Sequence, residues 1–293
     1  MRKGTYELTS FFFVVPALLI FSVFYIYPFF KVFHLSMHSW DGIEPAMKFV
    51  GFANFKEIMF DDAAWWSSMR NAGYITLWAL TFQNIVALLL ALGCDRAIRS
   101  GAIYRVIFFI PPILSEIVVG LVWKWVYNGD FGILNHWLTT LGFGYLAKDW
   151  LSDPTTALTS IAVVHSWKGF GWAFIIFLAG LQTIPRQLYE AAKVDGANAW
   201  RRFTNVTVPM MIPVFVLVVI LTILGAMQGF ALILAMTGGG PAGHTEVPVI
   251  RILNSMTEYG RFGYACAQAI VFGFVLVTVS FLFNRLSRFL KQA

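Results

Sequence analysis

Charged residues are scarce in this chain of 293 residues, at 12% of the total, whereas apolar residues make up 58%. A single soluble core could not bury that much apolar surface, so the composition indicates that lipid is the solvent for most of the chain. The alternative, an unusually aromatic soluble core, fits less well because 11 Trp residues suit a protein with two membrane interfaces.

Cysteine is rare as well, and Cys94 and Cys266 each fall inside or beside an apolar segment without CxxC spacing. We therefore expect neither a structural disulfide nor a metal site. The chain also lacks a GxxxxGK[ST] run and any nucleophile and base pattern, so we expect it to have no catalytic residues and no ATP hydrolysis of its own. Its formal charge of +6 does not indicate nucleic-acid binding, because the basic residues are not gathered into a stripe.

Six apolar stretches are long enough to cross a bilayer as helices, which takes about 20 residues each. They lack the period-two alternation of barrel strands. The predicted fold class is therefore an all-α integral membrane protein with six transmembrane helices, forming one domain over residues 1–293. The predicted spans are residues 11–30, 74–94, 104–127, 156–181, 209–236 and 262–283, the first of them a retained span rather than a cleaved signal peptide.

The distribution of Lys and Arg predicts the orientation of these spans. With the N-terminus inside, eleven basic residues fall in the inner segments between these spans and seven in the longer outer loops. Because cytoplasmic segments carry the excess of Lys and Arg, we expect both termini to be cytoplasmic.

The connection between spans four and five, residues 184–209, carries the most informative pattern. Pro185 suits the first turn of a helix, so a short helix is predicted from about Pro185 to Val194. Gly196 then allows the chain to turn. Two alanines, Ala191 and Ala192, let another surface approach this helix closely, which favours docking into a groove of a partner protein. The alternative is an amphipathic helix lying on lipid.

This segment resembles the EAA loop of ABC importer permeases, whose pattern is Glu-Ala-Ala, three residues, Gly, nine residues, Ile-x-Leu-Pro. The matching residues at the same spacing are Glu190, Ala191, Ala192, Gly196, Val206, Val208 and Pro209. The form extended by Asp195, Ala197 and Trp200 is similar to the sugar permease branch of that family. Three further stretches, residues 49–55, 132–135 and 237–241, resemble the same branch, so the similarity covers nearly the whole chain.

The resemblance implies a permease subunit of an ATP-driven, binding-protein-dependent importer of sugars or oligosaccharides in the bacterial inner membrane. It implies a second homologous permease, two ATPase subunits and an extracytoplasmic substrate-binding protein as partners, with ATP and magnesium bound by the ATPase and no cofactor in this chain. The residues implied to couple to the ATPase, on a cytoplasmic coupling helix, are Glu190, Ala191, Ala192, Asp195, Gly196 and Ala197.

Three alternatives to this function stay open at this point. Within the family, glycerol phosphate or another small solute could be the cargo. An ion-coupled secondary transporter should show more spans and an inverted repeat, and an intramembrane enzyme should show paired catalytic side chains.

Ionisable residues at membrane depth are costly and usually face a partner or a cavity. Glu116 lies in the predicted third span and Lys168 in the fourth, with His165 almost one turn earlier. We predict that Glu116 and Lys168 pair, and the alternative is a proton or substrate path. Pro111 and Pro112 should bend the third span.

A sugar has apolar ring faces and a polar rim, so its path should offer aromatic rings beside hydrogen-bonding groups. The candidates for lining the path are Gln228, Phe230, Trp167, Phe170 and Trp172, together with Gly225 and Gly229. For each of them helix packing is the alternative role.

Overall fold

The computed structural model describes residues 13–95 and 101–290 of the chain, and most of these residues are helical. The predicted all-α fold class is confirmed. The chain divides into two compact units, of which the first contains the described residues up to Ala63 and Ile252–Val275, and the second contains Ala64–Arg251 and the described residues from Leu276. Three helices, α4 (Ala63–Trp78), α14 (Pro248–Thr257) and α15 (Phe262–Leu290), contribute residues to both units.

The first unit holds a long apolar helix, a short hairpin and a surface helix. Its elements are η1 (Ser22–Ile26), α2 (Tyr27–Ser36), β1 (His38–Ser39), β2 (Lys48–Phe49) and α3 (Ala53–Phe60). The two strands pair antiparallel, with His38 opposite Phe49. Arg261 fixes the start of α15 to α3 by donating two hydrogen bonds, of 2.7 and 2.6 Å, to the Glu57 carboxylate. That ion pair raises the pKa of the Arg261 guanidinium, so it stays charged.

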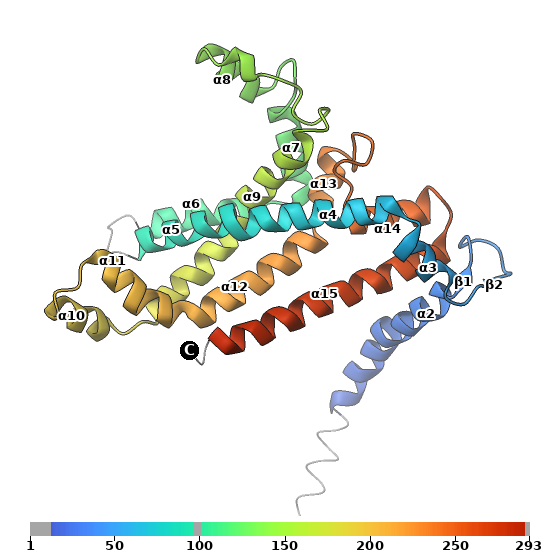
Figure 1. Cartoon of the computed structure of the whole chain (residues 1–293), viewed down its shortest axis with the longest axis horizontal. Coiled ribbons are helices and arrows are strands. Elements are labelled where there is room, and N and C mark those ends of the chain that lie inside the picture. Colours follow the sequence, from blue (N-terminus) through green and yellow to red (C-terminus); the bar gives the residue numbers. More distant parts are fainter. Residues whose placement is uncertain (1–12, 96–100, 291–293) are drawn as a thin grey trace, which may run out of the picture. The chain divides into compact units, whose positions relative to one another are not determined.

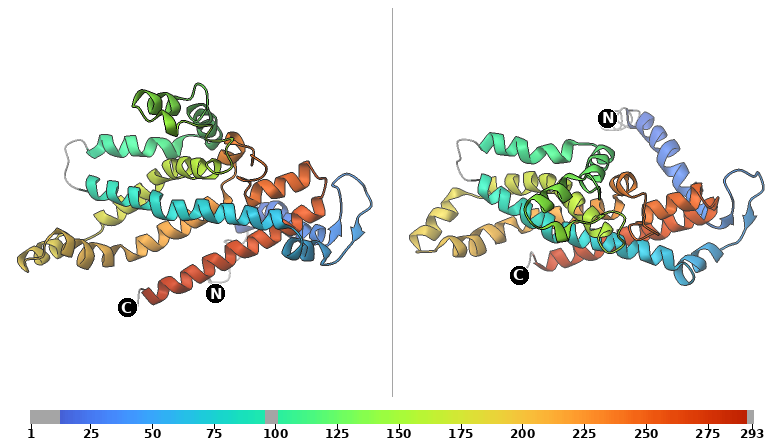
Figure 2. Two further views of the ribbon diagram at one scale, coloured as in Figure 1. Left: turned by 45° about the horizontal axis from the view of Figure 1, so that its top comes forward. Right: turned by 90° about the horizontal axis from the view of Figure 1, so that it is seen from above.

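The second unit is a helical bundle in which α9 packs against α5, α6 and α12 (Figures 1 and 2). Its elements up to the fourth span are α4 (Ala63–Trp78), η2 (Ala79–Gln83), α5 (Asn84–Cys94), α6 (Gly101–Ile113), α7 (Glu116–Val126), α8 (Ile133–Thr140), η3 (Gly144–Leu146) and α9 (Ala157–Gln182). They are followed by α10 (Arg186–Val194), α11 (Ala199–Arg202), η4 (Phe203–Thr207), α12 (Val208–Gln228) and α13 (Ala231–Met236).

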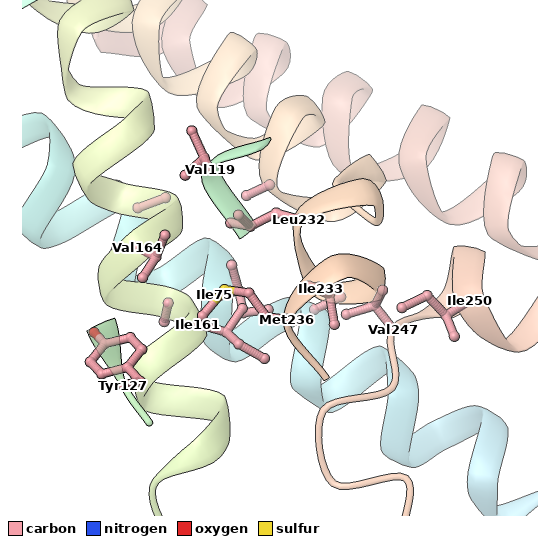
Figure 3. Packing of buried hydrophobic residues seen from close by; sticks show 14 residues of the cluster. Ile75, Val119, Tyr127, Ile161, Val164, Leu232, Ile233, Met236, Val247 and Ile250 are labelled. Carbon is pink, nitrogen blue, oxygen red and sulfur yellow. The ribbon is translucent and has the colours of Figure 1, made fainter. Parts of the chain in front are cut away.

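Two clusters of buried apolar side chains hold this bundle together. One cluster joins α4, α7, α9, α13 and the loop before α14, and it includes Ile75, Ile161 and Met236 (Figure 3). The other joins α5, α9 and α12 around Phe174 and Met211. The helices approach closely where small residues face one another, since membrane helices associate by packing rather than by the hydrophobic effect.

Glycines make two of these contacts possible. A Cβ at Gly120 of α7 would lie 2.6 Å from the Ala235 side chain of α13. A Cβ at Gly171 of α9 would overlap the Phe108 carbonyl oxygen of α6 and lie 2.6 Å from Pro112. Neither position has room for a larger side chain.

Five helices are long and apolar enough to cross a membrane, and a bent pair makes a sixth crossing if it counts as one span. The five, within the part of the chain that the structure describes, are Phe13–Ser36, Ala63–Cys94, Ala157–Gln182, Ala199–Gln228 and Phe262–Arg285. The predicted spans 156–181 and 262–283 match closely. Residues 11 and 12 of the first predicted span lie outside the described residues.

Three predicted spans need correction. The helix predicted at 74–94 begins at Ala63, because the segment before Tyr74 continues the same helix. The span predicted at 104–127 is two helices bent by 94°, after the two prolines that lack a backbone N–H. The span predicted at 209–236 ends at Gln228, because Gly229 and Phe230 have extended or irregular backbone and α13 is a separate helix.

Candidate functional site

A cavity of about 300 Å³ lies inside the second unit, between the second, fourth and fifth spans and the start of α7. Polar and apolar side chains both line it. The polar lining residues are Gln83, Glu116, His165, Lys168 and Thr222, and the others are Gly169, Trp172, Ala173, Ile176, Val218, Leu221, Gly225 and Ala226. So many polar groups at membrane depth are costly unless they serve a cavity or a partner.

Glu116 and Lys168 meet at this cavity, with the ammonium nitrogen 3.9 Å from a carboxylate oxygen. The structure thus places the two predicted partners beside each other. Glu116 is the first residue of α7, directly after the bend, and Lys168 lies near the middle of α9. The N-terminal end of a helix stabilises an anion, so the bend places Glu116 where its charge is favoured. The Lys168 side chain is 14% exposed and that of Glu116 is 41% exposed.

Two amides of the second span were not among the sequence candidates. Gln83 ends the π-helical segment η2 and lines the cavity while only 6% exposed, and its Oε1 has no hydrogen-bond partner among the described residues. Asn84, the next residue, accepts a hydrogen bond of 3.2 Å from the Thr222 hydroxyl of α12. π-Helical turns inside α-helices often occur at functional sites. Adjacent amides within an apolar run were the signal that could have found them.

Gly169 makes room for Gln83 at this side of the cavity. A Cβ there would overlap the Gln83 side-chain amide, so the glycine gives that amide its place between the second and fourth spans. Gly225 of α12, a predicted candidate, also lines the cavity, and a Cβ added there would have no heavy atom within 4 Å. The two glycines thus act differently, because one accommodates a neighbouring side chain and the other leaves open space.

The five aromatic and amide candidates for the path all lie in the described residues, but the structure places only one of them in the lining of the cavity. Trp172 lines the cavity and is 56% exposed. Trp167 packs edge-on against Trp123 at 5.4 Å between ring centroids. Phe170 packs against Phe108. The remaining two, Gln228 and Phe230, flank the break between α12 and α13 and are not among the cavity's lining residues.

The segment between the fourth and fifth spans contains a helix where one was predicted. It is α10, Arg186–Val194, and Pro185 stands at its N-cap position. Gly196 follows with φ +73°, a left-handed conformation that favours glycine. Asn198 then caps α11 by accepting a hydrogen bond of 2.9 Å from the Arg201 backbone N–H.

The surface of α10 and the turn after it is largely uncovered in this chain. Glu190, Ala191, Asp195 and Gly196 are exposed, and Ala192 and Ala197 are half-buried. Large apolar side chains beside them are exposed as well, namely Leu188, Val194 and Trp200. A helix with exposed apolar and small residues has the shape of a docking element.

A family model described as "Binding-protein-dependent transport system inner membrane component" matches residues 2–293. The chain belongs to this family. The resemblance seen in the sequence is therefore confirmed, and the chain is a membrane permease subunit of an ABC importer.

Curated relatives of this permease cover most of its length. It is 31% identical over 276 residues to the probable ABC transporter permease protein YurN of Bacillus subtilis, covering 94% of each chain. It is 33% identical to the diacetylchitobiose uptake system permease protein NgcF of Streptomyces coelicolor, over 98% of this chain and 85% of that one. It is 31% identical to the sn-glycerol-3-phosphate transport system permease protein UgpA of Agrobacterium fabrum, over 91% of this chain and 90% of that one.

A solved structure shares the fold of this permease. It is a chain of a bacterial alginate ABC transporter in complex with an alginate pentasaccharide-bound periplasmic protein, with a TM-score of 0.84 and 21% identity. The match covers 99% of this chain and 97% of that chain.

Proposed function

We propose that this permease subunit carries sugars or oligosaccharides across the inner membrane, and the observation that supports this most is the cavity around Gln83 and Trp172. An exposed indole ring can contact the apolar face of a pyranose. The side-chain amide of Gln83, which lines the cavity, can exchange hydrogen bonds with a sugar hydroxyl. Relatives named for a disaccharide and for glycerol phosphate support a polyhydroxylated solute.

In this proposal the chain works with a second homologous permease, two ATPase subunits and an extracytoplasmic substrate-binding protein. ATP and magnesium bind to the ATPase subunits, and this chain needs no cofactor. Both termini and α10 face the cytoplasm, as the excess of Lys and Arg on that side favours.

Coupling to ATP hydrolysis is assigned to α10 and the turn after it. Glu190, Ala191, Ala192, Asp195, Gly196 and Ala197 are proposed to contact the ATPase. Closure of the two ATPase subunits would draw this helix inward, and the movement would pass to α12, which lines the cavity. The cavity would then open alternately to each side of the membrane.

Glycerol phosphate is a second candidate cargo, because Lys168 lines the cavity and a cation can bind a phosphate. An ion-coupled mechanism is not favoured, since the family draws its energy from an ATPase.

Reconstitution tests the proposed function. The complete importer in liposomes should accumulate a labelled sugar from a panel of mono- and disaccharides only when ATP is inside and the binding protein is outside. Uptake that proceeds without ATP, or complete failure to transport any sugar by an intact and ATP-hydrolysing complex, would contradict the proposal.

A further inference from the structure

We propose that the Glu116–Lys168 pair makes the cavity select uncharged, hydroxyl-rich solutes over anionic ones. This inference rests on the proposed function and sharpens it, because it decides between the neutral and the phosphorylated class of cargo. It starts from the charges that the cavity presents to a solute.

The cavity lining carries one anion and one cation among its described residues, and they lie 3.9 Å apart. His165, the other ionisable lining residue, sits on the same helix almost one turn before Lys168. Lys168 lies near the basic side chain of His165, and the Glu116 carboxylate stabilises the charge of Lys168 there. The pair therefore leaves the cavity with Lys168 already neutralised.

An anionic solute would meet one obstacle here. An anionic group that binds Lys168 would lie within a few ångströms of the Glu116 carboxylate, which carries the same charge. The backbone of Glu116 is fixed at the start of α7, which packs on α13 through Gly120, so the carboxylate stays within side-chain reach of Lys168. At membrane depth few water molecules screen such a repulsion.

A neutral sugar meets no such obstacle. The side-chain amide of Gln83, which lines the cavity, is uncharged and can exchange hydrogen bonds with a sugar hydroxyl. An ammonium group has three N–H donors, so Lys168 can keep Glu116 as its partner and still donate to a hydroxyl oxygen. Trp172 supplies the apolar surface. The ion pair, the Gln83 amide and the Trp172 ring therefore suit an uncharged polyol.

Removing the anion should reverse the preference. In Glu116→Gln the shape is kept and Lys168 becomes an unpaired cation, which a carboxylate or phosphate would neutralise. In the double variant Glu116→Gln, Lys168→Met the cavity is uncharged again, so the preference for neutral solutes should return. Asp130→Asn, which removes an exposed carboxylate in the connection after α7, is the matched control.

The test is a binding measurement on the purified complete complex without its binding protein, so that the selectivity of that protein does not enter. The probes are neutral disaccharides, aldobiouronic acids of the same linkages, and glycerol phosphate, with quenching of tryptophan fluorescence and calorimetry as readouts. We expect the wild type to bind a neutral probe at least tenfold more tightly than the matching acid. The affinity for the neutral probe divided by the affinity for the acid should fall at least tenfold in Glu116→Gln. Asp130→Asn should keep the wild-type value of this ratio.

The wild-type ratio alone can overturn the inference, whatever the variants do. Equal or tighter binding of acids by the wild type would overturn it, and ATP-driven uptake of those acids would show that the proposed importer function still stands. An unchanged ratio in an intact Glu116→Gln complex would also overturn it. If no probe binds and no solute is taken up by an assembled complex, the proposed function and this inference fall together.

Discussion

The hydroxyl groups of Tyr189 and Thr207 lie 2.9 Å apart and share a hydrogen bond. Tyr189 belongs to α10, and Thr207 is a buried residue at the end of η4, where the chain continues directly into α12. This hydrogen bond connects the exposed helix α10 directly to the span that lines the cavity. A movement of α10 can therefore reach α12 without relying on the turn at Gly196.

Tyr189→Phe should weaken this link while keeping the ring. We expect a loss of stability of about 1 kcal/mol and a several-fold lower number of solute molecules carried per ATP hydrolysed. Thr207→Val tests the same bond from the other side. Paired measurements of uptake and hydrolysis in liposomes check the prediction, and it fails if the two substitutions together have the sum of their separate effects.

Gly196→Pro should abolish transport and leave the membrane spans folded. Proline fixes φ near −65° and removes the N–H that Gly196 donates to the Lys193 carbonyl, whereas this turn has φ +73°. Gly196→Asn is the matched control, because asparagine tolerates the left-handed conformation, and it should keep most activity. Binding-protein-stimulated ATPase activity and co-purification of the ATPase subunit are the measurements.

Glu190→Lys should give the same loss of transport for a different reason. Glu190 is exposed on α10, and reversing its charge replaces attraction with repulsion at the proposed contact with the ATPase. Normal stimulated hydrolysis and uptake in both Glu190→Lys and Gly196→Pro would show that this segment is not the coupling element.

Gly171→Ala should destabilise the permease, because the added methyl group overlaps the Phe108 carbonyl and crowds Pro112. We expect a cost of roughly 1–3 kcal/mol, typical of overpacking. Gly93→Ala in α5 is the matched control, because a Cβ added at Gly93 would have no heavy atom within 4 Å. This substitution should be neutral or slightly stabilising. Thermal unfolding in detergent measures both. Equal midpoints would mean that α6 and α9 do not pack this closely.

The orientation can be tested by cysteine labelling after replacing Cys94 and Cys266. Asn198→Cys should resist an impermeant reagent applied to intact cells and react after disruption, because the excess of basic residues predicts that it is cytoplasmic. Tyr145→Cys, at an exposed position of the predicted outer connection, should react in intact cells. Labelling of position 198 from outside would overturn the orientation.

The sequence could predict the spans and the α10 helix because hydropathy, proline and glycine act locally. It could also suggest the Glu116–Lys168 pair, because two opposite charges at membrane depth have few ways of being stabilised other than by pairing. It could not predict that the fifth span ends at Gln228. The run from Pro209 to Met236 is apolar apart from Thr222 and Gln228, and the break comes from the backbone at Gly229 and Phe230.

The cavity was harder to predict than the helices. Trp167 and Phe170 look like path residues in sequence, yet their rings are used in packing against Trp123 and Phe108. The adjacent amides Gln83 and Asn84 do not identify a cavity by themselves, because amides in an apolar run also serve in helix packing. Which of these roles a side chain has depends on the neighbours that helix packing brings to it, and those neighbours are far away in sequence.

The closeness of Glu116 and Lys168 also has an electrical consequence. A charge that crosses the full membrane potential exchanges about 2.3 kcal/mol per 100 mV with the field. A carboxylate and an ammonium that move together, 3.9 Å apart, carry no net charge, so the field does almost no work on them as a unit. If the pair stays closed while the cavity changes sides, uptake of an uncharged solute should proceed at the same rate in energised and depolarised membranes, provided that ATP is held constant.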